Sequence, residues 1–224
     1  MSKQTRGDKG EKIVSEFLKS LPGFHLQFDN YTYLNPKSGI SHQIDHIFIH
    51  KNGVFVIETK NYYGTIISNT GDVFWYKIIN DKKTIISNPL IQNKSHLKLI
   101  EKLLNKECDV IQVVVFVKNN APDIDDNVIN ANDLGLFIES YPYKKPLGKE
   151  EIEDIYKRLR LHSEKVDIKK HVESVQKVKR VKDNRHERMR VVIETGRCPT
   201  CNTKVLVDGY SYKCPRCGFK FSLN

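Results

Sequence analysis

The spacing of apolar residues alternates between helical and strand patterns along the first half of the chain. Between positions 8 and 21, apolar residues recur every three or four positions, which predicts an amphipathic helix. Residues 24–34 alternate between apolar and polar side chains, as in a half-buried strand. Residues 43–64 contain two apolar runs on either side of Asn52-Gly53, a dipeptide typical of a type I′ turn. We therefore expect a helix, a strand and a β-hairpin in this order.

Shorter elements follow up to about residue 140. Short strands are expected over 65–87, with turns at Thr70-Gly71 and Asn80-Asp81. Asn88 can cap a helix and Pro89 suits its first position, so a helix is expected to run to about residue 105. The apolar run VIQVVVFV has the length of a buried strand, and a short strand near residue 128 and a short helix over 134–139 complete the pattern. This order predicts an α/β domain.

The last third of the chain has a different composition. Two prolines and a glycine between residues 142 and 148 mark a boundary, and an amphipathic helix is expected over 149–162. Residues 164–190 are rich in Lys, Arg, Glu and Val, which indicates a partly helical, solvated linker. Its basic residues are candidates for phosphate contacts, and a merely solvated charged helix is the alternative. The candidates are Lys179, Arg180, Lys182 and Arg185.

Composition limits the class of protein. The chain has 224 residues, of which 39% are hydrophobic, enough for one packed domain and a small appendage. No apolar run approaches the roughly 20 residues that a membrane span requires. The first twelve residues are polar and lack the apolar segment of a secretory signal. We therefore expect a soluble, intracellular protein of the cytoplasm with no membrane partner.

The positive charge is concentrated near the C-terminus. Residues 1–147 hold 18 basic and 16 acidic residues, a net charge of +2, whereas residues 148–224 hold 19 and 11, a net charge of +8. Such a surplus favours a polyanionic partner, of which nucleic acid is the commonest. Charge that serves only solubility is the alternative.

The predicted hairpin brings charged residues together inside apolar runs. With Asn52-Gly53 as a two-residue loop, Lys51 pairs with Val54, and the same register places Asp45 opposite Lys60. Because side chains alternate between faces, Asp45, Glu58 and Lys60 then emerge on one face, within about 5–7 Å of one another. Two carboxylates beside an ammonium favour a hard cation, so we expect a Mg²⁺ or Mn²⁺ site. A structural salt-bridge cluster is the alternative.

Three segments also resemble a known family. GDKGEKIVSEFL, IDHIFIHKNGVFVIETKNYYG and NPLIQNKSHLKLI resemble the nuclease-related domain, NERD, over residues 6–140. This family is similar to the PD-(D/E)xK, restriction-endonuclease-like superfamily, whose motif is an acidic residue followed by a strand bearing acid-x-lysine. Asp45, Glu58 and Lys60 match that motif, and the backbone carbonyl of Thr59 matches a metal ligand. Ile44 stands where the superfamily name has proline.

The resemblance adds two residues to the candidate catalytic site. Glu11, near the start of the first helix, matches an acidic residue that supports the metal site in this fold. A first-turn glutamate placed by the helix dipole is the alternative. Gln92 matches the NPxxQN segment, where it can bond the active-site lysine, a water or a phosphate. An exposed helix glutamine is the alternative.

Four cysteines near the C-terminus indicate a zinc ribbon. Cys198, Cys201, Cys214 and Cys217 have C-x₂-C-x₁₂-C-x₂-C spacing, so two knuckles supply four thiolates for tetrahedral Zn²⁺. A hairpin turn is expected at Asp208-Gly209 between them. So short a segment needs the metal for its stability. Cys108 stands apart and is expected to be a buried apolar residue.

The ribbon is similar to the four-cysteine fingers at the ends of topoisomerases and other DNA enzymes. Its aromatic and basic residues can stack on bases and contact phosphates. The alternative is a structural or protein-binding ribbon whose aromatics form its own small core. The candidate nucleic-acid-binding residues of the ribbon are Tyr210, Tyr212, Lys213 and Arg216.

Together these observations predict a three-part chain. A restriction-endonuclease-like domain with a mixed sheet flanked by helices is expected over 1–147, a basic helical linker over 148–192 and the zinc ribbon over 193–224. The expected activity is metal-dependent hydrolysis of DNA phosphodiesters. The alternatives are a catalytically inactive DNA-binding or scaffold protein and an RNA nuclease. The sequence does not distinguish cleavage mode, specificity or oligomeric state, and a helicase or other DNA-processing partner stays open.

Overall fold

The computed structural model describes residues 5–35, 41–68, 72–143, 145–163, 184–185 and 187–222. Its elements up to residue 163 are α1 (Arg6–Ser20), β1 (Leu26–Leu34), β2 (Ser41–His50), β3 (Gly53–Lys60), β4 (Thr65–Ile67), β5 (Phe74–Ile79), β6 (Lys82–Ser87), α2 (Pro89–Leu103), β7 (Val110–Phe116), β8 (Val128–Asn130), η1 (Ala131–Asp133), α3 (Leu134–Ser140) and α4 (Lys149–Ser163). No helix of this described part is long and apolar enough to cross a membrane.

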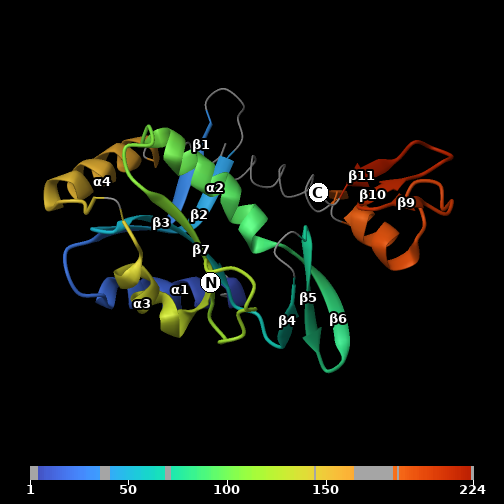
Figure 1. Cartoon of the computed structure of the whole chain (residues 1–224), viewed down its shortest axis with the longest axis horizontal. Coiled ribbons are helices and arrows are strands. Elements are labelled where there is room, and N and C mark those ends of the chain that lie inside the picture. The colour runs from blue at the N-terminus through green and yellow to red at the C-terminus, as the bar shows by residue number, and fades with distance from the viewer. Residues whose placement is uncertain are drawn as a thin grey trace.

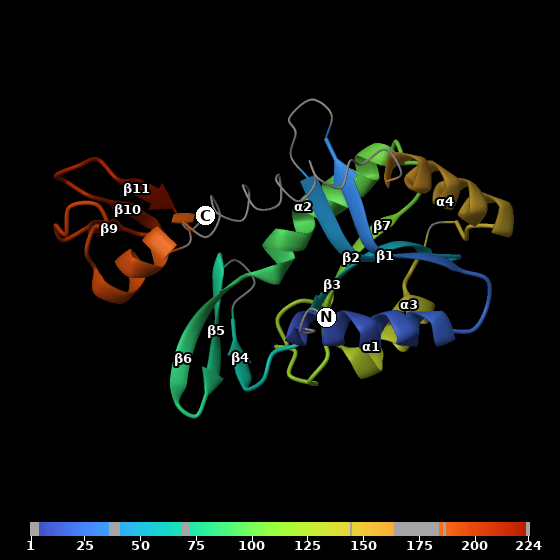
Figure 2. The same cartoon turned by 180° about the vertical axis from the view of Figure 1, so that it is seen from behind.

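A mixed five-stranded sheet lies at the centre of the N-terminal part, with strand order β1-β2-β3-β7-β8 (Figure 1). The neighbours β1-β2 and β2-β3 are antiparallel, whereas β3-β7 and β7-β8 are parallel. Helices α2 and α4 cover one face of the sheet, and α1 and α3 cover the other (Figures 1 and 2). The predicted α/β class with a mixed sheet flanked by helices is confirmed.

The central strand β3 is apolar because both of its faces are covered. Val54 and Val56 belong to the core beneath α2 and α4, whereas Phe55 and Ile57 belong to the core beneath α1 and α3. Each of these side chains is fully buried, a change that stabilises the fold by about 1.5–3 kcal/mol per large apolar side chain. Packing on both sides therefore determines which side chains of β3 point toward each face of the sheet. Because side chains alternate along a strand, it also determines the faces of Glu58 and Lys60 at the end of β3.

Polar contacts set the start of the two helices that approach the end of β3 and fasten one of them to the sheet. Thr5 and Asp8 form a capping box at the start of α1, and Asn88 caps α2 by accepting from the backbone N–H of Leu90. In α2, the fully buried Asn93 donates from Nδ2 to the carbonyls of Val56, at 2.8 Å, and Val113, at 3.1 Å. One amide therefore ties α2 to both β3 and β7.

The hairpin register differs from the prediction. His50 pairs with Gly53 and Ile47 pairs with Val56, so the loop is Lys51-Asn52 and not Asn52-Gly53. Gly53 has φ +130, and a Cβ there would come within 2.9 Å of the Asp109 carbonyl, so the glycine permits close packing of this backbone. The predicted type I′ turn and the pairing of Asp45 with Lys60 are therefore wrong. Because the shift moves one strand by two residues, the faces of its side chains are unchanged.

Two further features follow the predicted order of elements. Strands β4, β5 and β6 form a separate antiparallel sheet, and Asn80 and Asp81 both have positive φ in the turn between β5 and β6. The other predicted turn, at residues 70–71, lies outside the described residues. Both helix 89–103 and strand 110–116 match the expected positions closely.

Helix α4 packs on the sheet. Ile152, Ile155 and Leu159 join the core shared with β2 and β3, and the Tyr31 hydroxyl of β1 donates to the Leu159 carbonyl at 2.9 Å. The sequence placed this helix in the linker, at 148–192. We propose that the domain boundary lies after α4, because separating the helix from the sheet would expose three buried apolar side chains.

The C-terminal part is built around a three-stranded sheet of order β11-β10-β9, namely β9 (Leu206–Asp208), β10 (Ser211–Lys213) and β11 (Lys220–Ser222). Residues 187–195 are helical, and Val192 joins a core with Val205, Cys198 and Cys214. Asp208 pairs with Ser211, so the hairpin loop is Gly209-Tyr210, one residue later than predicted. The basic candidates Lys179, Arg180 and Lys182 lie outside the described residues.

We expect Asn93→Ala to lower the free energy of unfolding by about 1–3 kcal/mol, because two buried carbonyls lose their donor. Urea denaturation checks this, with Lys94→Ala, an exposed neighbour on α2, as the matched control. If Asn93→Ala were as stable as Lys94→Ala, the amide would not hold α2 against the sheet.

Candidate functional site

The end of β3 places a buried acid and a buried lysine on the face covered by α2. Lys60 Nζ donates to Glu58 Oε1 at 2.5 Å, and the two side chains are only 13% and 5% exposed. Gln92 of α2 donates from Nε2 to the same Glu58 oxygen at 2.7 Å, and its Oε1 lies 3.5 Å from Lys60 Nζ. Gln92 is therefore part of this cluster, and not an exposed helix residue.

Asp45 approaches the same strand end through the backbone. Its Oδ2 accepts from the Thr59 N–H at 2.8 Å, just beyond the last paired residues of β2 and β3, His46 and Ile57. In an extended strand the N–H and C=O of one residue point to the same side. The Thr59 carbonyl is therefore expected to point toward the Asp45 side, as a metal ligand at this position requires.

Glu11 reaches the site from α1, on the other face of the sheet. Burial raises the pKa of the half-buried Glu11, and the carboxylates of Asp8 and Glu58 raise it further, against the opposing effects of His46 and Lys60. Its electrostatic coupling to Glu58 and Lys60 places it in the same charged neighbourhood. Asp45, Glu58, Lys60 and Gln92 therefore lie together at the end of β3. Glu11, on α1, is near enough to act on them electrostatically.

The site contains more acidic groups than cations. Burial, and then the Glu58 carboxylate, raise the pKa of Asp45 to about 8, with Glu11 adding to the shift. Burial acts to lower the pKa of Lys60, but the Glu58 carboxylate outweighs it and the pKa is raised, so Lys60 is charged. One ammonium thus faces three acidic side chains, an arrangement that an additional cation would stabilise.

The acidic side chains at the end of β3 are not gathered as closely as the ligands of a complete metal site. Among the described residues, the only group of three or more His, Cys, Asp or Glu ligand atoms within 4.8 Å of one another is the cysteine cluster. Glu58 is engaged by Lys60 and Gln92, and Asp45 by the Thr59 N–H. Carboxylate and carbonyl oxygens suit Mg²⁺, which also keeps several waters and needs few protein ligands. The donor set fits this cation.

A polar network near Glu11 was not predicted from the sequence. Asp29 accepts from His46 Nδ1 at 2.8 Å and from Ser15 Oγ at 2.7 Å, and Lys19 Nζ lies 3.0 Å away. Burial would raise the pKa of Asp29, but these hydrogen bonds outweigh it and hold the pKa below its usual range. His46 is 1% exposed, and its Nε2 has no hydrogen-bond partner among the described residues. The pairing of Asp29 with His46 across β1 and β2 is the signal that would have revealed it.

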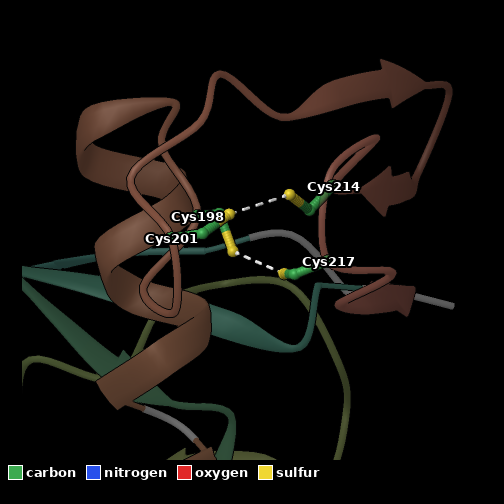
Figure 3. A group of neighbouring side chains, drawn as sticks. All are labelled: Cys198, Cys201, Cys214 and Cys217. Carbon is green, nitrogen blue, oxygen red and sulfur yellow. Dashed lines mark hydrogen bonds between the residues drawn. The ribbon is translucent and has the colours of Figure 1, made fainter.

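The four predicted zinc ligands form one cluster (Figure 3). Cys198 Sγ lies 3.4 Å from Cys217 Sγ, and Cys201 Sγ lies 3.4 Å from Cys214 Sγ. Tetrahedral zinc with Zn–S distances of about 2.3 Å requires sulfur separations of about 3.8 Å, so a small adjustment suffices. Hydrogen bonds from the Thr203 hydroxyl and backbone lower the pKa of Cys201 to about 6, which favours the thiolate. The cluster can bind zinc.

The candidate nucleic-acid-binding residues of the ribbon differ in their surroundings. Tyr210 is 63% exposed in the hairpin loop, whereas the Tyr212 ring stacks on Phe221, with centroids 4.6 Å apart, inside the ribbon core. Arg185, Lys213 and Arg216 are exposed. The exposed ring and the three cations can meet a ligand directly, and Tyr212 supports the ribbon.

Cys108 lies away from both sites. It packs against the core beneath α2 and α4, and burial raises the pKa of its thiol to about 11. The thiol is therefore the protonated form at neutral pH, in agreement with the expected apolar role.

Comparison with known proteins connects the first site to a family. The family model described as "Nuclease-related domain" matches residues 6–117. This range contains the five candidate catalytic residues, Glu11, Asp45, Glu58, Lys60 and Gln92. The chain is also 36% identical over 176 residues to the uncharacterized protein pXO1-01 of Bacillus anthracis, an alignment that covers 75% of this chain and 82% of that protein. No solved structure matches the chain significantly.

Asp45→Asn should flatten the pH dependence of stability in the absence of Mg²⁺. Because the pKa of Asp45 is raised from 3.8 to about 8, the folded chain retains a proton that the unfolded chain releases. That contribution is complete below about pH 4 and is lost as the pH rises through about 8. Urea unfolding of zinc-loaded protein between pH 6 and 9 should show a steeper fall for the wild type. Exposed Asp133→Asn is the control, and parallel curves for wild type and Asp45→Asn would contradict the expectation.

Zinc content provides a test of the cysteine cluster. Cys214→Ser should reduce bound zinc from about one ion per chain to well below one, because a three-thiolate site leaves one coordination position without its protein ligand. Cys108→Ser should retain the full zinc content. Elemental analysis of the purified full chain measures both. Wild-type protein without zinc, or equal loss in the two variants, would refute the assignment.

Proposed function

The chain belongs to the nuclease-related domain family, and on this premise we propose that it is a metal-dependent nuclease that hydrolyses phosphodiester bonds of DNA. The observation that supports the proposal most directly is the convergence of Asp45, Glu58 and Lys60 at the end of β3. Each belongs to the acid, acid-x-lysine motif of the restriction-endonuclease-like superfamily. We further propose that the basic linker and the ribbon bind nucleic acid and that the protein acts in the cytoplasm.

The charged cluster can hold the metal through oxygen ligands. Asp45, Glu58 and the Thr59 carbonyl are the proposed ligands of Mg²⁺ or Mn²⁺, with Glu11 supporting them from α1. When bound, such an ion polarises a phosphoryl oxygen and lowers the pKa of a coordinated water. The raised pKa of Asp45 is the reason to expect a strong response to a cation, because the ion replaces a proton that the site otherwise retains.

The remaining residues of the site are proposed to position the reacting groups and to neutralise charge on the phosphate. Hydrolysis joins a water oxygen to phosphorus and breaks one ester bond, leaving a hydroxyl and a phosphomonoester. The Lys60 ammonium is charged and only 13% exposed, and its proposed role is to orient the water or to stabilise the negative charge that develops on phosphate. Gln92 holds Glu58 Oε1 through its Nε2–H at 2.7 Å, which fixes the rotamer of the carboxylate.

One observation favours a second candidate, a DNA-binding protein that retains the nuclease fold without catalysis. The Lys60–Glu58 ion pair already neutralises one carboxylate, and the acids are not gathered as the cysteines are. An RNA nuclease would use the same cluster. Substrate comparison separates these candidates.

We expect Asp45→Asn and Lys60→Met each to reduce the cleavage rate about 10²-fold or more, because each removes a group that acts on the developing charge. Plasmid, single-stranded DNA and RNA are incubated with Mg²⁺ or Mn²⁺ and resolved on gels. Lys12→Met, a change of an exposed lysine on α1, is the control and should cleave like the wild type.

Three outcomes would decide between the candidates. Activity that survives Asp45→Asn or Lys60→Met at the level of the control contradicts the catalytic assignment. Wild-type protein that binds DNA but cleaves no substrate supports the inactive candidate. Cleavage confined to RNA moves the proposal to ribonuclease activity.

A further inference from the structure

A cavity of about 400 Å³ lies between the helical residues 184–185 and 187–195 and strand β11 of the ribbon. Part of its wall is apolar, formed by Met189, Phe219 and Phe221. The rest is polar or cationic, formed by Asn184, Arg185, Arg188 and Lys220. Asp and Glu are absent from these lining residues, so the cavity combines aromatic surface with three positive charges.

Arg188 is held in place at the cavity wall. Its Nη2 donates to the Thr200 hydroxyl at 2.7 Å, and its guanidinium carbon lies 4.6 Å from the centre of the Phe219 ring. Thr200 stands between Cys198 and Cys201, so the first knuckle of the cysteine cluster positions this arginine. A guanidinium held over an aromatic ring is a flat, cationic surface whose other side can take a second planar group.

The positive charges that line the cavity are not neutralised by the acidic residues nearby on the same helix. Arg190, two residues along the same helix, pairs with Glu187 at 2.9 Å and with Glu194 at 3.9 Å. In the ion pairs of the described residues, these two acids go to Arg190 and Arg188 has no carboxylate partner. Lys220 of β11 lies directly opposite Lys213 of β10, and like charges in that position destabilise a strand pair. An anion bound here would relieve the repulsion.

We propose that this cavity binds one unstacked base of single-stranded nucleic acid together with its flanking phosphates. The base stacks on the Arg188 guanidinium, and Arg185 and Lys220 contact the phosphates. The inference rests on nucleic-acid binding by the ribbon, as proposed above, but is independent of cleavage. It assigns the contacts to the helix side of β11 and adds Arg188 to the candidates from the sequence.

The shape of the cavity favours a single strand over other polyanions. A duplex presents phosphates on its outside and keeps the faces of its bases stacked, so it offers no flat group to a recessed aromatic wall. An acidic peptide offers carboxylates but no planar ring. The combination of fixed guanidinium, aromatic wall and free cations therefore matches a nucleotide unit best.

Binding by the full chain tests the proposal. A fluorescein-labelled twelve-residue oligothymidylate is titrated by anisotropy against zinc-loaded protein that carries Asp45→Ala, so that cleavage does not interfere. Arg188→Ala should weaken binding about ten-fold. Lys220→Ala should reduce the slope of log affinity against log salt by about 0.7. Arg190→Ala, the matched control on the same helix, should change affinity less than two-fold.

Arg188→Ala also removes the hydrogen bond to Thr200, so a loss of binding could reflect a disturbed ribbon. Arg185→Ala removes a cavity cation without touching that bond and serves as a second variant. Every variant must keep the zinc content of the wild type. Weaker binding by Arg188→Ala and by Arg185→Ala, each with full zinc content, supports the site. Equal affinities of Arg188→Ala and Arg190→Ala overturn it. So does an equal loss of affinity for duplex DNA of the same sequence, or displacement of the oligonucleotide by polyglutamate at matched charge. Failure of cleavage in the wild type leaves this binding result intact, so the two proposals fail separately.

Discussion

Carboxylates buried beside one another repel, and the end of β3 depends on a cation to offset that repulsion. Glu58 is only 4% exposed, and the pKa of Asp45 rises to about 8 because of its burial and this neighbour. Lys60 supplies one positive charge, but Glu11 also contributes negative charge from α1. The site is therefore electrostatically incomplete as it stands. Buried acidic groups that outnumber the nearby cations are costly in a folded protein, and they are typical of sites at which a ligand supplies the opposite charge.

The rest of the domain maintains this arrangement. Strand β3 is buried on both faces by four helices, so its last residues cannot turn away from the site without disturbing the core. Asn93 fastens α2 to β3 and β7, which places Gln92 over Glu58 within 2.7 Å. On the opposite face, Asp29 and Ser15 join β1 to α1, the helix that carries Glu11. Elements on both faces of the sheet therefore support the cluster at the end of β3.

Much of this arrangement follows from local sequence signals, and the errors have identifiable causes. The Asn88 cap and the apolar run 110–116 specify elements by their own chemistry. The hairpin was placed two residues out of register because Asn52-Gly53 suits a type I′ turn, whereas Gly53 here serves close packing against Asp109. A shift of two residues preserves alternation, so Asp45, Glu58 and Lys60 still meet. Side-chain contacts between neighbouring strands, such as Asp29 with His46, have no local signal. The amphipathic pattern of α4 likewise does not reveal that its apolar face packs on the sheet.

The two candidate metal centres differ in what the metal does for the fold. Four thiolates can complete a tetrahedral zinc site by themselves, and the ribbon core contains few buried side chains besides two of these cysteines. Its folding is therefore expected to depend on the ion. The carboxylate site lies in a domain with two large apolar cores that do not need a metal, so the divalent ion proposed for it would be free to exchange and to interact with substrate. On this contrast, the zinc is expected to stabilise the ribbon, whereas the proposed divalent ion of the first domain would serve catalysis. Thr200, within the first knuckle, holds Arg188 by a hydrogen bond of 2.7 Å, so the cysteine cluster and the cavity beside β11 share one support.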